Sequence, residues 1–436
     1  MTEPAQKLAR RLGLFDATML VMNGIIGAGI FINPYVVAKQ VHTSPLILGA
    51  WLLGGVVAIA GAFIYADLAR LLPEVGGQYA YLREAYSPLV AFLYGWVLLL
   101  VIQTGGMAAV TITFAKYFLE GTHSAVPIWV IAVVSIAALT IMNCFGVRSG
   151  GTLQSGLMVV KVVVIAMFVV LGMVYVKSSN LAFHPVLDRP FGGGMLSAFG
   201  GAMAPVLFSY AGWQTASFVG GELKNPGKDL PRGLLMGVGG VIAIYLAVSF
   251  VCLRALGPAG LAATETPASS VMRAAFGNTG ARLIAVAIAI SALGFLSQGL
   301  LTAPRVYFAM AEDGVFFREM AWLHPATRVP VFAIVLQSVL TMVILLSGTF
   351  EQILNYVVVM DWTFFGLSAA SLFVLSKASG TKPRVPGHPY TTLLFCLACA
   401  AIVLNTIYRY PAHTGVAIAI MLSGVPVYYL WRRRAA

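Results

Sequence analysis

Long apolar segments separated by short polar breaks recur along the whole chain. Each is close to the roughly 20 residues that an α-helix needs to cross a bilayer. No polar linker or low-complexity stretch interrupts the series, so the pattern predicts one all-α polytopic membrane domain over residues 1–436. Its roughly twelve expected spans have cores at 16–38, 46–71, 88–118, 127–146, 154–176, 195–221, 233–256, 281–308, 330–347, 352–376, 391–408 and 413–431.

The composition indicates a lipid environment. Of the 436 residues, 59% are hydrophobic and only 10% are charged, whereas soluble domains carry about 25% charged residues. The formal net charge is +12, but no basic run is interleaved with aromatic residues, so we expect no nucleic-acid partner. In membrane proteins such an excess of basic residues marks cytoplasmic loops.

The positions of Lys and Arg predict the orientation. With a cytoplasmic N-terminus and twelve crossings, 18 of them fall inside and 8 outside, while Lys161 remains within a span. This distribution predicts a multi-pass protein of the inner (plasma) membrane with both termini in the cytoplasm. The polar and basic segment Met1–Leu14 lacks the apolar core of a signal peptide.

The cysteines and histidines form no metal-binding pattern. Cys144, Cys252, Cys396 and Cys399 lie in apolar segments, and the single C-x-x-C has neither a second pair nor a nearby His. The histidines lie near predicted loops and lack the spacing of zinc sites. We therefore expect no metal, no cofactor and no disulfide framework.

The first span contains three glycines, Gly24, Gly27 and Gly29, within six residues. Each lowers helix stability by about 1 kcal/mol relative to Ala, and unwound backbone inside a membrane is tolerated only against protein or a water-filled cavity. The N–H groups of Ala28 and Gly29 would then begin a second half-helix and suit a carboxylate, whereas the carbonyl of Ile25 would suit an ammonium group. Close helix packing through small residues is the alternative.

The sixth span is interrupted in a similar way within Phe208–Trp213, where Gly212 permits a break. Carbonyls of Phe208, Ser209 and Ala211 could face the same cavity, and the Phe208 ring is large enough to gate a bound small molecule. Simple packing of the aromatic side chains is the alternative.

Each interrupted span is the first of a set of five. Broken helices at matching positions of two halves are typical of transporters with an inverted repeat and a binding site near the membrane midplane. We therefore divide the predicted domain into a first five-helix repeat at 16–176, a second at 195–376 and two extra helices at 391–431.

Two charged residues fall well inside predicted spans. A Lys at a helix centre costs about 2.5–3.5 kcal/mol on insertion scales, so Lys161 is a functional candidate. Its ammonium could replace a bound cation, with Ser291 in the eighth span as a partner, or it could extend to the cytoplasmic face. For Asp361 in the tenth span, substrate contact, proton coupling and a structural hydrogen bond are equally open.

Several motifs point to one family. They are G-I-I-G-A-G-I-F at Gly24–Phe31, P-E-V-G-G-Q-Y at Pro73–Tyr79, F-S-Y-A-G-W at Phe208–Trp213, Lys161 in the fifth span, and Asp361-Trp362 in place of an Asn-Trp pair. Together they resemble the amino acid–polyamine–organocation superfamily and, within it, the L-type amino acid transporter family. The similarity extends from about residue 12 to residue 376.

The resemblance implies a leucine-transporter fold, with two inverted five-helix repeats plus two helices and with discontinuous helices 1 and 6. The substrate would be an α-amino acid whose carboxylate meets backbone amides of the first break and whose ammonium meets carbonyls of both breaks. Lys161 would make transport independent of sodium. The implied substrate-binding residues are Ile25, Gly27, Ala28, Gly29, Phe208, Ser209, Ala211, Gly212 and Asp361.

Departures from the family pattern affect two expectations. Ala28 stands where the family has Ser, so backbone amides alone would hold the carboxylate. Eukaryotic members pair with a glycoprotein through a Cys after the third helix, and the corresponding loop at Glu120–Val126 has none. We therefore expect no disulfide-linked heavy chain.

The leading hypothesis is a sodium-independent transporter of neutral, small L-amino acids that works by alternating access, as an exchanger or with proton coupling. A polyamine or organic-cation carrier would need acidic residues in the cavity, and only Asp361 qualifies. An integral-membrane enzyme would need a nucleophile, paired carboxylates or a His cluster, which the spans lack. A channel would lack the paired broken helices.

Overall fold

The computed structural model describes residues 12–27, 29–72, 76–122, 124–145, 150–177, 183–218, 223–325 and 329–435. Over these residues the chain is helical, with one isolated parallel bridge between Leu12 and Leu223 in place of any sheet. The predicted all-α class is confirmed.

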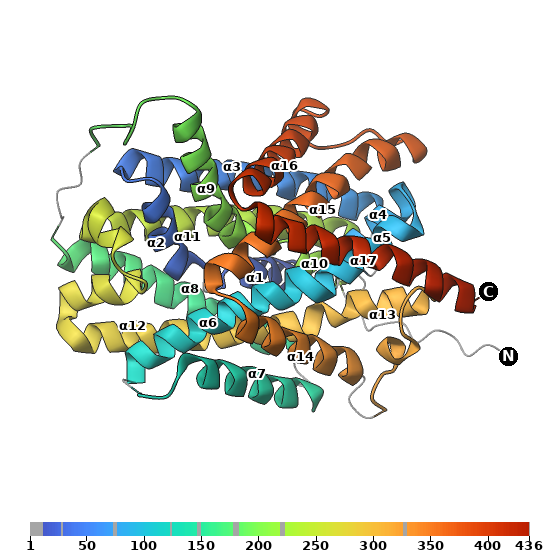
Figure 1. Ribbon diagram of the computed structural model, residues 1–436, viewed down its shortest axis with the longest axis horizontal. Helices are drawn as coiled ribbons and strands as arrows, with labels where there is room; N and C mark the ends of the chain where they lie inside the picture. Colours follow the sequence, from blue (N-terminus) through green and yellow to red (C-terminus); the bar gives the residue numbers. More distant parts are fainter. Residues whose placement is uncertain are drawn as a thin grey trace.

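The helices form a bundle whose long elements run broadly along one direction (Figure 1). The first half comprises α1 (Leu14–Ile25), α2 (Gly29–Gln40), α3 (Ser44–Leu71), α4 (Gln78–Ala85), α5 (Pro88–Val97), α6 (Gln103–Thr122), α7 (Ile128–Cys144) and α8 (Gly150–Tyr175). The second half comprises α9 (Gly193–Tyr210), α10 (Thr215–Phe218), α11 (Pro226–Ala262), α12 (Pro267–Thr302), α13 (Pro304–Glu312), α14 (Val331–Ser347), α15 (Phe350–Ala378), α16 (Tyr390–Arg409) and α17 (Pro411–Ala435). A π-helical turn, Leu98–Ile102, joins α5 to α6, and a 3-10 turn, Arg318–Ala321, follows α13.

Ten helical segments of the described chain are long and apolar enough to cross a membrane, and the shorter apolar helices α7 and α14 fill the fourth and ninth predicted positions. Each of the twelve predicted spans thus has a helical counterpart. The chain is a multi-pass membrane protein.

In the part of the chain that the structure describes, four breaks interrupt the long elements. Those between α1 and α2 and between α9 and α10 fall in the two predicted segments. Two further breaks lie at Gly257 in α11 and Gly277 in α12, where φ is +67° and +65°. They fall just outside the predicted seventh and eighth spans, which end at residue 256 and begin at residue 281. Such positive φ values favour glycine because it lacks a Cβ.

The packing of α3 against α9 and α16 depends on small residues. A Cβ added to Gly54 would lie 2.3 Å from Cγ1 of Val206, and one added to Gly61 would lie 2.9 Å from the Phe395 ring. Helices in membranes associate through such close backbone approaches, since lipid supplies little hydrophobic driving force between them.

The variant Gly54→Leu should therefore destabilise the bundle, since overpacking a tight core typically costs about 1–3 kcal/mol. We expect a lower melting temperature and less monodisperse protein in fluorescence-detected size-exclusion chromatography. Gly49→Leu on the same helix is the matched control, because a Cβ at Gly49 meets nothing within 4 Å. Equal behaviour of the two variants would contradict this account of the α3–α9 contact.

Candidate functional site

The first break begins where α1 ends at Ile25. The Gly27 N–H turns back to donate to the Ile25 carbonyl at 2.8 Å, and α2 begins at Gly29. The first N–H groups of a helix have no partner within that helix, so the start of α2 presents free donors and a positive partial charge. Ala28, which was predicted to contribute one such amide, lies outside the described residues.

The second break lies between α9 and α10. Gly212 has a φ of +110°, and its N–H donates to Oε1 of Gln214 at 3.0 Å instead of extending α9. Thr215 is the first residue of the short helix α10, and its hydroxyl donates to the Gly212 carbonyl at 2.8 Å. Carbonyls in the last turn of α9 therefore lack helical donors.

The two breaks contact each other through glycine backbone. A Cβ on Gly212 would lie 2.1 Å from the Gly24 carbonyl oxygen, and a Cβ on Gly24 would lie 2.7 Å from the Gly212 carbonyl oxygen. Any side chain at either position would force the helices apart. Gly24 and Gly212 therefore allow the two helices to approach closely as well as to unwind. The two explanations given for these glycines, helix packing and helix unwinding, both apply.

Tyr245 of α11 links the breaks from behind. Its hydroxyl lies 2.9 Å from the carbonyl oxygen of Ile25 and 3.1 Å from that of Ser209. These are two of the carbonyls predicted for a substrate ammonium, and each retains a second lone pair. Our reading of the sequence missed Tyr245; the available signal was a polar hydroxyl in an apolar span, which must find a partner when buried.

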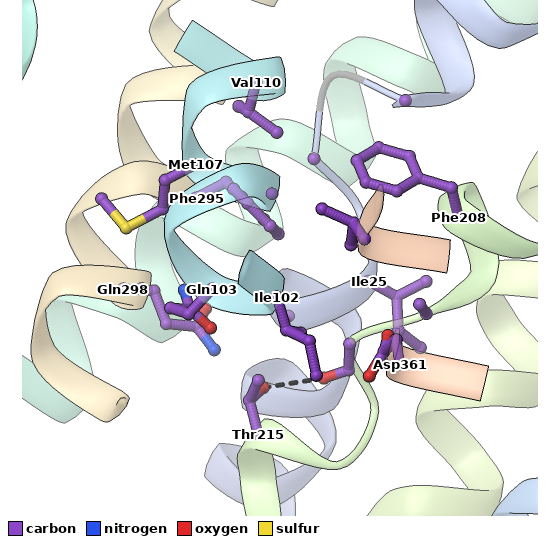
Figure 2. Close-up of a pocket in the computed structure, with 18 of the residues that line it drawn as sticks. Ile25, Ile102, Gln103, Met107, Val110, Phe208, Thr215, Phe295, Gln298 and Asp361 are labelled. Atoms are coloured by element: carbon purple, nitrogen blue, oxygen red, sulfur yellow. Dashed lines mark hydrogen bonds between the residues drawn. The ribbon is translucent and has the colours of Figure 1, made fainter. Parts of the chain in front are cut away.

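A cavity lies between the breaks (Figure 2). It brings together every described residue that was predicted to bind substrate: Ile25, Gly27, Gly29, Phe208, Ser209, Ala211, Gly212 and Asp361. The opposite wall was not predicted and comes from the π-turn and α6 with Ile102, Gln103, Gly106, Met107 and Val110, and from α12 with Phe295, Gln298, Gly299 and Thr302.

The lining has two different ends. Figure 2 places Phe208 toward the same end as Val110, and Asp361 toward the other end with Thr215. Phe208 is half-buried, as a side chain at a cavity edge should be. The cavity therefore has an aromatic and aliphatic end and an end with polar side chains.

Lys161 of α8 lies behind the first break. Its ammonium donates to the Ile26 carbonyl at 2.8 Å and to Oδ1 of Asn23 at 2.7 Å, and only 6% of the residue is exposed. The Asn23 amide in turn donates to Oε1 of Gln298, whose own amide donates to the Leu20 carbonyl at 3.2 Å. Lys161 thus joins α8, α1 and α12 and does not extend to a membrane face.

The expected direct contact between Lys161 and Ser291 is wrong. Among the described residues the Ser291 hydroxyl is buried without a hydrogen-bond partner. Gln298 takes its place two helical turns further along α12 and reaches Lys161 through Asn23. The sequence correctly predicted that Lys161 of α8 is linked to α12. It did not predict which residue of α12 lies at the depth of Lys161 in the membrane.

Asp361 of α15 is 4% exposed, and its carboxylate lines the cavity without a hydrogen bond or ion pair to any residue that the structure describes. Lys161 makes no ion pair with Asp361, because its ammonium is bonded to Asn23 and Ile26. No three His, Cys, Asp or Glu side chains gather into a metal-binding group in the described ranges.

Comparison with known proteins shows the family of the chain. Residues 12–429 match the family model described as amino acid permease. The chain is 31% identical over 437 residues to the serine/threonine exchanger SteT of Bacillus subtilis, with 98% of each chain covered. It is 28% identical to the human large neutral amino acids transporter small subunit 2 (97% of this chain, 80% of the relative) and 27% identical to the human cystine/glutamate transporter (98% and 86%). The chain belongs to the amino acid permease family.

Proposed function

We propose that the protein is a sodium-independent transporter of small, neutral L-amino acids that works by alternating access. The observation that carries the proposal is the cavity formed where two broken helices meet, lined by the α2 start and the α9 end. We infer the leucine-transporter fold, with inverted repeats at 16–176 and 195–376 and two extra helices, and an inner-membrane orientation with cytoplasmic termini.

The polarity of the two breaks favours a zwitterion. The start of α2 supplies amide donors and a positive partial charge that suit a carboxylate. Among the described residues, Gly29 provides one of these amides. The carbonyls of Phe208 and Ala211, in and just after the last turn of α9, suit an ammonium group. Those of Ile25 and Ser209 can share it with the Tyr245 hydroxyl.

The size of the cavity favours a small side chain. Its volume is about 80 Å³, and one water needs roughly 10–15 Å³ on the same scale. The cavity thus has room for about five to eight water-sized groups, which suits alanine or serine better than a large aromatic amino acid. The name of the serine/threonine exchanger SteT agrees with this inference and favours exchange.

The contacts of Lys161 support the absence of a sodium site at this point. Its ammonium lies between the Ile26 carbonyl, directly after α1, and the amide oxygen of Asn23, where a small cation would otherwise be held. We also infer that no disulfide-linked heavy chain is needed, because the described cysteines, Cys144, Cys252, Cys396 and Cys399, are free and lie in helices α7, α11 and α16.

The purified protein in liposomes loaded with unlabelled alanine should exchange it for external radiolabelled alanine and serine with saturable kinetics. Replacement of sodium by choline should leave the rate unchanged. No saturable uptake of any α-amino acid, with or without internal substrate, would refute the proposal. Competition by putrescine but not by alanine would favour a polyamine carrier.

Lys161→Ala should abolish exchange or reduce it by at least about tenfold. The variant removes the two hydrogen bonds that the ammonium donates beside the first break, to the Ile26 carbonyl and to Oδ1 of Asn23, and hydrogen bonds from a charged donor contribute about 1.5–3 kcal/mol each. Lys177→Ala, at an exposed lysine after the same helix, is the control and should behave as wild type. Wild-type exchange by well-folded Lys161→Ala protein would exclude the role of cation substitute.

Phe208→Ala should weaken the apparent affinity for alanine roughly tenfold, because about 1.5 kcal/mol of apolar contact over the substrate is lost. Concentration-dependent uptake measures the effect. Leu196→Ala, on the exposed face of the same helix, should leave the affinity unchanged. If both variants match wild type, Phe208 is not a gate.

A further inference from the structure

The proposed binding of a neutral amino acid assigns no role to the Asp361 carboxyl, although this group lines the cavity. Its carboxyl is buried in α15, one helical turn from the cavity residue Val357, and makes no hydrogen bond or ion pair within the described chain. A buried carboxylate without a partner is strongly disfavoured, so such a group either binds a proton or pairs with a cation.

No neighbouring side chain supplies that cation. The titratable groups that face Asp361 are Tyr65 of α3, Tyr94 of α5 and Cys399 of α16, none of which carries positive charge. Other charged or titratable groups on the helices around α15 are engaged elsewhere or lie at its ends: Asp67 with Arg70 and Arg384, Arg83 with Asp313, Lys116 with Glu265, Glu120 with Arg273, Arg409 with Ser197 and Gln40, and His413 against Tyr356.

The charge of the Asp361 carboxyl also depends on whether water fills the cavity. Ile102 and Val357 line the wall with Asp361, and neither can solvate a carboxylate. While the cavity is open to water, an ionised carboxylate is hydrated. When the cavity closes over a neutral amino acid, water leaves and the ionised carboxylate loses its hydration.

We propose that Asp361 is the proton carrier of this transporter. Its carboxylate takes a proton from water while the cavity is open, stays neutral while the cavity closes over a neutral amino acid, and returns the proton to water on the other side. Each crossing of a neutral substrate then includes one proton, in both directions of an exchange cycle. The inference rests on the proposed function, since it assumes a cavity that opens and closes.

The test is alanine–alanine exchange in liposomes at equal internal and external pH, from pH 5 to pH 9. Because the neutral carboxyl is the competent form, the wild-type rate should be highest at low pH and should fall by up to about tenfold per pH unit on the alkaline side. In Asp361→Asn, whose amide resembles the protonated carboxyl in shape, this decline should disappear from a profile normalised to the variant's own maximum.

Glu351→Gln is the matched control, because this carboxylate lies on the same helix but is exposed beside Lys39. It should keep the wild-type profile. If Asp361→Asn is inactive, Asp361→Glu retains a carboxyl and should still lose exchange as the pH rises.

A flat wild-type profile would overturn the proposal. So would an alkaline decline that persists in Asp361→Asn, which would belong to another group such as Lys161, and so would a flat profile in an active Asp361→Glu protein. These results differ from failure of the proposed function, in which wild-type protein takes up no α-amino acid at any pH.

Discussion

The contact between the backbones of Gly24 and Gly212 is the constraint on which the rest of the site depends. Each break leaves backbone groups without helical partners, and those groups are acceptable inside a membrane only if another element shields them. The two interrupted helices meet with carbonyl oxygens at distances that exclude even a methyl group. The cavity lies between the two breaks that this contact holds together, with Gly24 and Gly212 among its lining residues.

Hydrogen bonds from two further helices hold the broken segments in place. Tyr245 reaches both breaks from α11, and Lys161 reaches the first from α8. Through Asn23 and Gln298 the same polar chain extends to α12. A change in the position of α1 would therefore strain bonds to three neighbouring helices, which couples the site to the helices that surround it.

Much of this arrangement could be predicted from the sequence, for identifiable reasons. The spans follow from apolar length, and the breaks follow from glycines where a helix former would be expected. The residues along the breaks were found because they are consecutive in sequence. Tyr245, Asn23 and Gln298 were missed, and Ser291 was chosen wrongly, because these depend on how each helix is rotated and how deep it sits. A pattern along one helix contains neither quantity for its neighbour.

The π-helical turn between α5 and α6 has a consequence for the phase of that span. An α-helix advances by about 100° per residue, and a π-turn accommodates one extra residue without breaking the rod. Before the turn, Phe92 faces Trp96, Phe316 and Tyr428; after it, Met107 and Val110 face the cavity. Removing one residue from Leu98–Ile102 would make the helix continuous and rotate its halves out of phase. Either the packing against α17 or the cavity wall would then be lost. The π-turn thus allows α5 to pack against α17 while α6, in the same span, lines the cavity.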